Sequence, residues 1–283
     1  MLSYRHAFHA GNVADILKHL VLVNTLHYAM RKDTPLFYLD THAGAGHYNL
    51  DSEQSQKTAE AEAGILTLDF ASLVTGLSEE SAQAITFYQQ AVEPFLLKNQ
   101  YPGSPLLAAT LLRAQDHLHL CDLHPADFAE LKKLASRDRR IYVEQTDGYQ
   151  RAMGLIPPVQ KRAVILIDPS YERDEDYRLV VKLAADIHRR MASAQVLLWY
   201  PVVRRDAVER MVNALVNRSP RDLWRFELGV RQDKDGDGMT GSGMLVINPP
   251  WTLPSRLEHC LPRLQQQLES SGGYWTVERL TPE

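Results

Sequence analysis

The stretch that most constrains the fold is residues 164–171, which read VILIDPSY. Its first four residues are apolar and mostly β-branched, which is typical of a strand buried on both faces of a parallel α/β sheet. Asp168 and Pro169 end that strand, because proline fixes φ and has no N–H to donate. In open α/β sheets, ligands bind at the carboxyl ends of the strands. The stretch therefore predicts a ligand-binding edge that carries a carboxylate, a backbone carbonyl and the ring of Tyr171.

These groups suit methylation of the exocyclic amino group of adenine. The lone pair of that nitrogen is delocalised into the ring, and a carboxylate is too weak a base to deprotonate the nitrogen first. If the Asp168 carboxylate and the Pro169 carbonyl each accept one hydrogen, the lone pair turns toward an incoming methyl group. Tyr171 would stack on the base after it leaves its helix. The run resembles the [D/N]-P-P-[Y/F/W] motif of adenine-N6 and related amino-group methyltransferases, with Ser170 replacing the second proline. An ordinary Asp-Pro turn is the alternative.

Length and composition bound the class of protein. The 283 residues can hold one large α/β domain with an insertion or two modest domains. No apolar run approaches the roughly 20 residues of a membrane span, and the first dozen residues lack the apolar core of a signal peptide. Cys121 and Cys260 show no metal spacing and suit buried thiols in a reducing cytoplasm. Because the net charge is −4, any nucleic-acid contact should be a local patch around one flipped base.

A helix is predicted over residues 13–30, with Asn12 or Asp15 near its start and apolar residues along it. Lys18 and His19 lie about one turn into this helix, close enough to face whatever the N-terminal residues fold over. A frayed terminus and a solvated helix face are the alternative interpretation.

The first strand is predicted over residues 35–40, and the glycine-rich loop THAGAGHY follows it at residues 41–48. Glycines allow the backbone to approach a nucleotide closely. The dehydrogenase fingerprint needs a further glycine or alanine three residues after the second glycine, where this chain has Asn49. A cofactor without a pyrophosphate is therefore favoured, and S-adenosylmethionine is such a cofactor.

Residues 50–101 are rich in Glu, Gln, Ala and Ser, with apolar residues at helical spacing and no strand signal. We expect an inserted helical subdomain there. Residues 1–49 and 102–283 would then supply the main domain. After the insertion, Ser104 is predicted to cap a helix that runs to Gln115, with Pro105 at its first position.

Acids recur at the ends of the predicted strands. After Asp40 at the first strand, residues 117–122 end in Asp122, and the third strand at residues 141–144 is followed by Asp147. Asp168 closes the fourth strand. In Rossmann-type sheets, an acid after the second strand accepts hydrogen bonds from ribose hydroxyls. Such a series predicts one acidic edge along a parallel sheet.

The last part of the sheet is predicted to differ in topology. Two successive strands, at residues 224–230 and 244–247, break the alternation of strand and helix and suggest the β-hairpin that closes methyltransferase sheets. The second of these strands ends in residues 248–251, NPPW, which match the catalytic tetrapeptide more fully than the Asp168 run. That run comes last in the sheet order without a glycine loop after it, so Asp168 is favoured. Asn248 is then a decoy or part of the pocket wall.

The chain closely resembles the bacterial 23S ribosomal RNA adenine-N6 methyltransferases of the RlmJ type over essentially its full length. The matching stretches are LSYRHAFHAGN, DILKH, YLDTHAGAG, YPGSPL, LHP, DG, WYPVV and INPPW. The resemblance implies an α/β fold: a Rossmann-like class I S-adenosylmethionine-dependent methyltransferase sheet with a terminal β-hairpin and an inserted helical subdomain. It also implies methyl transfer from S-adenosyl-L-methionine to N6 of adenine 2030 of 23S RNA, in reference numbering, before subunit assembly.

The resemblance also implies the residue roles. The catalytic residues would be Asp168, Pro169 and Tyr171. The cofactor-binding residues would be His19, His42, Ser104, Asp122, Asp147, Gly148 and Asp168. Tyr4, His6 and Lys18 match family positions at the RNA substrate, in an N-terminal tail that closes over the cofactor. Asp122 replaces the more usual glutamate of the family, and Ser170 replaces proline.

The expected partner is free 23S rRNA, with no metal, no membrane, no obligate protein partner, a monomeric state and a cytoplasmic location. Three alternatives are considered. One is an oxidoreductase that uses a nicotinamide cofactor. Another is a methyltransferase acting on a different substrate, such as DNA adenine or a protein glutamine amide. The third is a non-catalytic RNA-binding module, which the acidic net charge and the intact Asp168 disfavour.

Overall fold

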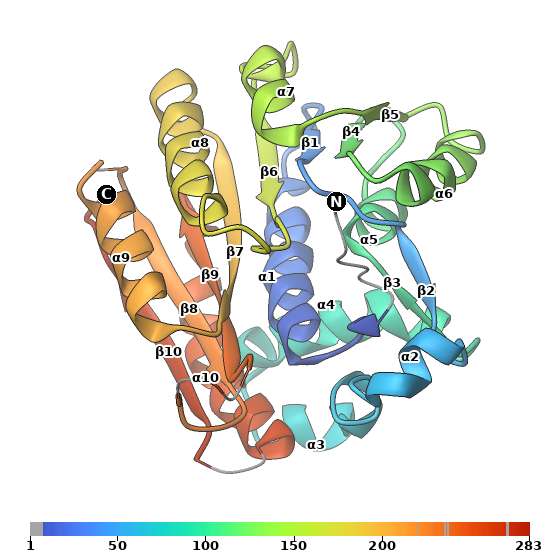
Figure 1. Ribbon diagram of the computed structural model, residues 1–283, viewed down its shortest axis with the longest axis vertical. Helices are drawn as coiled ribbons and strands as arrows, with labels where there is room; N and C mark the ends of the chain where they lie inside the picture. Colours follow the sequence, from blue (N-terminus) through green and yellow to red (C-terminus); the bar gives the residue numbers. More distant parts are fainter. Residues whose placement is uncertain (1–7, 219, 235, 237, 270–271) are drawn as a thin grey trace.

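The computed structural model describes residues 8–218, 220–234, 236, 238–269 and 272–283, and an eight-stranded sheet runs through it (Figure 1). The parallel strands are β1 (Phe37–Asp40), β4 (His117–Asp122), β5 (Ile141–Gln145), β6 (Ala163–Ile167) and β7 (Gln195–Val202). The antiparallel strands are β8 (Leu223–Gly229), β9 (Gly241–Ile247) and β10 (Tyr274–Arg279). The strand order is β10-β8-β9-β7-β6-β1-β4-β5.

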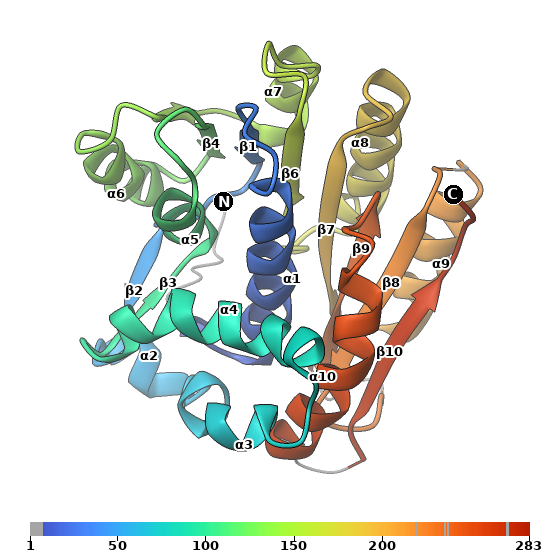
Figure 2. The same cartoon turned by 180° about the vertical axis from the view of Figure 1, so that it is seen from behind.

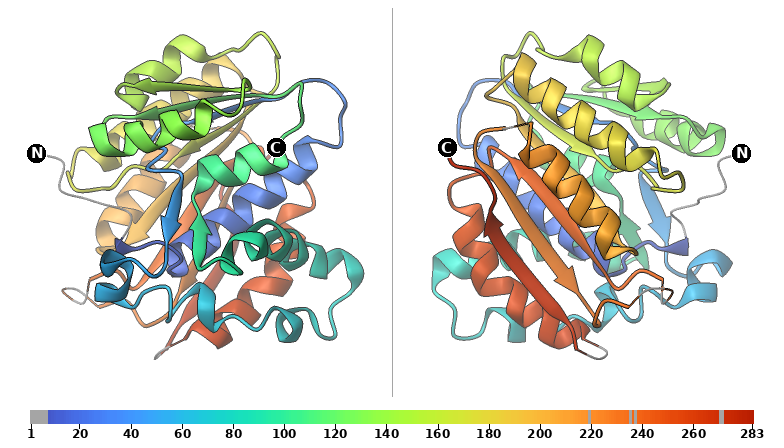
Figure 3. Two further views of the ribbon diagram at one scale, coloured as in Figure 1. Left: turned by 90° about the vertical axis from the view of Figure 1, so that its right-hand side faces the viewer. Right: turned by 60° about the vertical axis from the view of Figure 1, so that its left-hand side comes forward.

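Helices cover both faces of the sheet (Figures 1 and 2). One face carries α7 (Gly148–Leu155), α8 (Asp176–Arg190) and α9 (Arg205–Val216). The other carries α1 (Val13–Ala29), α5 (Ser104–Leu111), α6 (Pro125–Ala135) and α10 (Leu253–Leu268). In the right-hand view of Figure 3, α8 and α9 lie in front of the sheet and α1 and α10 behind it. The result is a three-layer α/β arrangement, as expected for a largely parallel sheet.

Strand β6 is buried on both faces, as its sequence predicts. Val164 and Leu166 belong to the core beneath α1, whereas Ile165 and Ile167 belong to the core beneath α8. The strand lies between β1 and β7, in the middle of the sheet. A continuous apolar run is the sequence that such a position requires.

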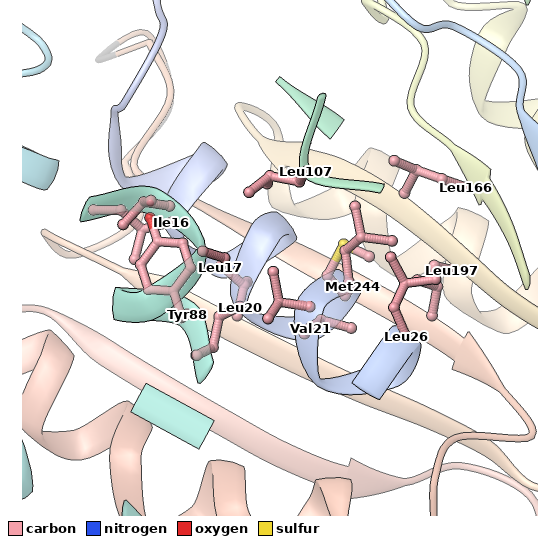
Figure 4. Packing of buried hydrophobic residues seen from close by; sticks show 14 of the residues in the cluster. Ile16, Leu17, Leu20, Val21, Leu26, Tyr88, Leu107, Leu166, Leu197 and Met244 are labelled. Atoms are coloured by element: carbon pink, nitrogen blue, oxygen red, sulfur yellow. The ribbon is translucent and has the colours of Figure 1, made fainter. Parts of the chain in front are cut away.

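Helix α1 lies in the centre of the molecule. Asn12 caps it, as one of the two predicted capping residues, by accepting a hydrogen bond from the Asp15 amide at 3.0 Å. Its apolar residues pack between the sheet and the long helix α4 (Glu79–Leu96) (Figure 4). The polar residues Lys18 and His19 are also buried, so the alternative of a solvated helix face is wrong.

The segment after the glycine-rich loop is mainly helical, as predicted. It contains α2 (Glu53–Thr58), the short 3-10 helix η2 (Ile65–Thr67), α3 (Phe70–Val74) and α4. The expectation that no strand occurs there is wrong, because β2 (His47–Asn49) pairs with β3 (Gln100–Pro102) where the segment begins and ends. Strands of three residues are too short to show an alternating pattern.

The predicted hairpin of β8 and β9 is confirmed, and it pairs with β7 through β9. Sequence reasoning did not identify α10 or β10, which extend this side of the molecule beyond the hairpin. No described helix is long and apolar enough to cross a membrane.

Candidate active site

A cleft of about 1060 Å³ opens at the carboxyl edge of the parallel strands. Ligand pockets typically occupy about 300–1,000 Å³, so the cleft can hold a nucleoside-sized cofactor beside part of a second ligand. Parallel pairing explains why the predicted residues converge there, since Asp40 is in register with both Leu120 and Leu166. The predicted residues that line the cleft are Lys18, His19, His42, Ser104, Asp122, Asp147, Asp168, Pro169 and Tyr171. Tyr4 and His6 lie outside the described residues.

Asp168 is held by a buried ammonium group. Lys18 Nζ lies 2.7 Å from Asp168 Oδ2 and 2.9 Å from Asp15 Oδ1. Burial alone would lower the pKa of Lys18, but the two carboxylates outweigh burial and raise its pKa well above the usual value. Lys18 is therefore charged, and it is buried against the Asp168-Pro169 turn rather than on an outer surface.

Tyr171 ends the turn after β6 in an unusual backbone conformation. This residue has a φ of 53°, a left-handed conformation that a bulky side chain rarely adopts. Its hydroxyl donates to the Trp199 carbonyl at 2.6 Å, and its ring lies 4.8 Å from the Tyr177 ring. Such backbone strain, on the order of 1–3 kcal/mol, is common at functional sites. Tyr171 thus lines the cleft with a ring whose far end is anchored in β7.

Asp122, at the end of β4, draws the glycine-rich loop onto the sheet. Its Oδ2 accepts from the Gly44 amide at 2.8 Å, and its Oδ1 accepts from the His124 amide at 2.7 Å. Burial raises the pKa of Asp122, and these amide hydrogen bonds act in the opposite direction. Gly44 has a φ of +62°, and a Cβ there would lie 2.6 Å from the Tyr48 hydroxyl. A side chain at position 44 would therefore adopt a strained backbone conformation and push the Tyr48 hydroxyl aside.

Asp147 and Gly148 form the start of α7. Asp147 caps the helix by accepting from the Tyr149 amide at 2.8 Å and the Gln150 amide at 3.3 Å. Gly148 does not line the cleft, because its Cα packs against the backbone of Thr41. A Cβ on Gly148 would lie 1.9 Å from the Thr41 carbonyl oxygen. Gly148 therefore joins the start of α7 to the loop after β1.

The two predicted histidines occupy different environments. His42 hydrogen-bonds to the Thr41 hydroxyl at 2.8 Å and meets the Tyr149 ring edge-on. Burial lowers the pKa of His42 to about 4, so it is neutral at physiological pH. His19 is fully buried, and its Nδ1 hydrogen-bonds to the Tyr101 hydroxyl at 2.9 Å. His19 thus links α1 to β3.

The prediction that Ser104 caps α5 is wrong. Gly103 is the capping residue, Ser104 is the first residue of the helix, and the helix ends at Leu111 rather than Gln115. The Ser104 hydroxyl instead donates to Asp40 Oδ2 at 2.6 Å. Burial raises the pKa of Asp40 to about 6, although hydrogen bonds from Ser104 and Tyr38 oppose that rise. Asp40 is a supporting residue that sequence reasoning placed on the edge without giving it a role.

Sequence reasoning also missed residues of the cleft wall. Tyr149 and Trp199 line it, and Lys18 Nζ lies 5.8 Å from the centre of the Trp199 ring. In the sequence, Trp199 belonged to the matching stretch WYPVV but was given no role. Asp15 was seen only as a candidate cap, because its contact with Lys18 depends on how α1 is buried.

The cleft fits a nucleoside cofactor without phosphates. Asp122 lies at the end of β4, where a carboxylate in Rossmann-type sheets accepts hydrogen bonds from ribose hydroxyls. The glycine-rich loop brings the backbone of Gly44 beside it. The cleft wall near this loop carries acids and the neutral His42. Such a lining attracts a cationic sulfonium compound and repels a negatively charged pyrophosphate.

The strand order, the antiparallel β9–β8 pair beside β7 and the cleft at the carboxyl edge define a Rossmann-like class I methyltransferase. Comparison with known proteins narrows this class. The family described as ribosomal RNA large subunit methyltransferase D, RlmJ, matches residues 33–281. The chain therefore belongs to the RlmJ family of ribosomal RNA large subunit methyltransferases.

Individual relatives agree with this assignment. Ribosomal RNA large subunit methyltransferase J of Haemophilus influenzae is 43% identical over 284 residues, and alignment covers 100% of both chains. The protein of the same name from Escherichia coli is 43% identical over 287 residues with the same coverage. A crystal structure of a protein from Legionella pneumophila is similar with a TM-score of 0.84 at 34% identity, covering 96% of this chain and 98% of that one.

Proposed function

We propose that the protein transfers a methyl group from S-adenosyl-L-methionine to the exocyclic N6 of a flipped-out adenine in 23S ribosomal RNA. The observation that carries the proposal is the Asp168-Pro169 turn at the end of β6, which lines the cleft with its carboxylate paired to Lys18. Family membership supports a ribosomal RNA substrate.

The cofactor would lie against Asp122, Asp147 and the loop around Gly44, with His19, His42 and Ser104 supporting that wall of the cleft. When bound, it supplies a methyl group on a positively charged sulfur. Asp122 would accept hydrogen bonds from the ribose, a role that its shorter side chain can fill in place of glutamate.

Asp168 and Pro169 would bind the target amine. The carboxylate of Asp168 accepts one N6 hydrogen and the Pro169 carbonyl accepts the other, so the nitrogen lone pair points at the methyl group. As the N–C bond formed, the sulfur–methyl bond would break and leave a neutral thioether. The nitrogen would then carry the positive charge, which the paired Asp168 carboxylate would stabilise. The surplus proton then leaves through Asp168 to water. Tyr171 would stack on the flipped base.

We also propose a specific target base and a role for each part of the chain. The target is adenine 2030 in reference numbering, in free RNA rather than the assembled subunit, modified by a cytoplasmic monomer without an obligate protein partner. Residues 1–49 and 102–283 act as the methyltransferase domain and residues 50–101 as its inserted subdomain. Tyr4 and His6 would contact the RNA from a tail that closes over the cleft.

Labelled methyl transfer tests the proposal directly. Protein-free 23S RNA, assembled large subunits and DNA are each incubated with enzyme and labelled cofactor, and the RNA is then digested to nucleosides. The label should appear as N6-methyladenosine from protein-free 23S RNA. Label in another nucleoside, or only in DNA, would refute the proposed substrate. A thermal shift with a nicotinamide cofactor and none with S-adenosylmethionine would favour the oxidoreductase alternative.

A further inference from the structure

A buried row of charges runs from the start of α1 to the turn after β6. It consists of Asp15, Lys18 and Asp168, whose side chains are only 1%, 6% and 13% exposed. The ammonium group of Lys18 contacts one oxygen of each carboxylate, at 2.9 Å and 2.7 Å. A carboxylate removed from water costs several kcal/mol unless a charge or hydrogen bonds compensate it. Asp15 therefore does more than begin a helix, a role that Asn12 already fills as the cap.

Asp15 limits where the lysine side chain can point. A lysine has four flexible torsions and loses much entropy when it is ordered. Asp15 lies one turn earlier on the same helix and holds Nζ from one side, while Asp168 holds it from the other. The Trp199 ring lies 5.8 Å from Nζ as a third contact. These contacts place the ammonium group so that it donates a hydrogen bond to Asp168 Oδ2.

The second oxygen of Asp15 reaches the N-terminal segment. Asp15 Oδ2 accepts from the Gly11 amide at 2.9 Å. On its other side, the Gly11 carbonyl accepts from the Ile65 amide at 2.8 Å. Gly11 has a φ of +80°, and a Cβ there would lie 2.8 Å from Ile65 Cγ2. Gly11 thus packs closely between the start of α1 and residues 50–101, the proposed inserted segment. We call this contact the Gly11 joint.

Other contacts strengthen this joint. His9 Nδ1 lies 2.9 Å from Glu60 Oε1, and Asn12 Nδ2 donates to Glu60 Oε2 at 2.8 Å. Gly64 packs so closely that a Cβ would lie 2.2 Å from the Gly11 carbonyl oxygen. The inserted segment therefore fixes the backbone of residues 9–12, and Asp15 connects that backbone to the Lys18–Asp168 pair.

We propose that Asp15 is a positioning residue for methyl transfer: it holds Lys18 against Asp168 and ties this pair to the Gly11 joint formed with the inserted segment. The inference rests on the proposed function for its kinetic consequence, but its structural half can be measured without any activity. It assigns the inserted segment a role, which is to hold residues 9–12 in place relative to Asp168.

The kinetic arm compares Asp15→Asn with Asp116→Asn. Asp116 is an equally buried carboxylate that accepts from the Leu36 amide and pairs with Arg113, and it does not line the cleft. Asp15→Asn should lower kcat on 23S RNA roughly 10- to 100-fold through misplacement of Lys18, with the KM for the cofactor changed less than about twofold. Asp116→Asn should lower the melting temperature without lowering kcat. Equal kcat in wild type and Asp15→Asn would overturn the proposal, as would equal kcat losses in both variants.

The structural arm measures hydrogen exchange at the Gly11 amide in wild type and Asp15→Ala. Loss of the acceptor should speed exchange by about tenfold or more, while the amides of β6 exchange as slowly as before. Unchanged exchange at Gly11 would contradict the proposed joint. If wild type methylates no RNA at all, the proposed function fails. The hydrogen-exchange comparison still decides whether Asp15 holds the Gly11 amide.

Discussion

The same kind of tetrapeptide occurs at both ends of the parallel strands. Only the tetrapeptide at their carboxyl ends lines the cleft. Residues 168–171 follow β6 at the carboxyl edge of the parallel strands. Residues 248–251 follow β9, which runs antiparallel to β7 and pairs its last residue, Ile247, with Val196 near the start of β7. The second motif therefore lies at the opposite edge. Strand direction, rather than the four residues themselves, decides which motif can reach a ligand.

The side chains at the two edges are also used differently. Asp168 lines the cleft and pairs with a buried ammonium group. Asn248 donates to the carbonyls of Ala192 and Ala194, so its side-chain amide connects the end of β9 to the loop before β7. Trp251 is 71% exposed and does not line the cleft. The alternative that Asn248 forms part of the pocket wall is therefore wrong, because Asn248 does not line the cleft, and the hypothesis that it is a decoy stays a prediction.

The largest effect is expected from Lys18→Met, because the carboxyl edge depends on buried charge. The variant leaves Asp15 and Asp168 without their shared cation, and breaking such a buried pair typically costs about 3–5 kcal/mol of folding stability. Denaturant unfolding should show this loss, and kcat should fall about a hundredfold or more. Unchanged stability with full activity would contradict the view that the carboxyl ends of the strands depend on the buried charge of Lys18.

Gly148→Ala should produce the next largest effect. The new Cβ would lie 1.9 Å from the Thr41 carbonyl oxygen, so the start of α7 must move away from the loop after β1. We expect about 1–3 kcal/mol of destabilisation and weaker cofactor binding, measured by calorimetry. Gly154→Ala in the same helix is the matched control, because its Cβ would meet only Arg151 Nη1 at 3.1 Å. Equal behaviour of both variants would contradict the role given to Gly148.

His42 gives a pH-dependent test of the carboxyl edge. Its pKa is lowered by burial from 6.5 to about 4. The folded protein therefore binds fewer protons than the unfolded chain between these values, and the contribution of His42 makes stability fall as pH decreases from 6.5 to 4. An NMR titration should find the His42 midpoint near 4, and stability of wild type relative to His42→Gln should fall in that window. A midpoint near 6.5 would show that His42 is not buried in the folded protein.

Ser170→Pro should have the smallest effect. The Ser170 amide donates no hydrogen bond to any residue in the part of the chain that the structure describes, so proline removes none there. If Ser170 leaves the turn looser than the family motif does, the variant raises kcat modestly with little change in cofactor affinity. Steady-state kinetics with calorimetry measure both quantities. An unchanged kcat would mean that Tyr171 and its hydrogen bond to Trp199 already fix the turn.

Much of the fold could be predicted because it depends on local apolar pattern. Residues 164–167 are apolar without interruption, and 117–122 end in an acid, and both stretches form the predicted strands. The pairs β2–β3 and β8–β10 were not predicted. Three-residue strands carry no periodicity, and β10 is an edge strand in which every residue is partly or fully exposed.

The site was predicted less completely, because its contacts join residues far apart in the sequence. Lys18 and Asp168 are 150 positions apart, and Ser104 and Asp40 are 64 apart. Sequence spacing gave Ser104 a local capping role, whereas a long-range hydrogen bond to a buried carboxylate determines its actual contact. The requirement for glycine at position 148 likewise follows from the approach of Thr41, which only the folded chain reveals.

The most direct test of the account is a comparison of Asp168→Ala with Asn248→Ala in the same methylation assay, with cofactor affinity measured in parallel. Asp168→Ala should lower kcat on 23S RNA about a hundredfold or more, equivalent to roughly 3–4 kcal/mol, while cofactor binding remains measurable. Asn248→Ala should leave kcat within about twofold of wild type, as expected for a substitution remote from the cleft. Near-normal turnover of Asp168→Ala, or a larger loss in Asn248→Ala, would contradict the assignment of methyl transfer to the carboxyl edge.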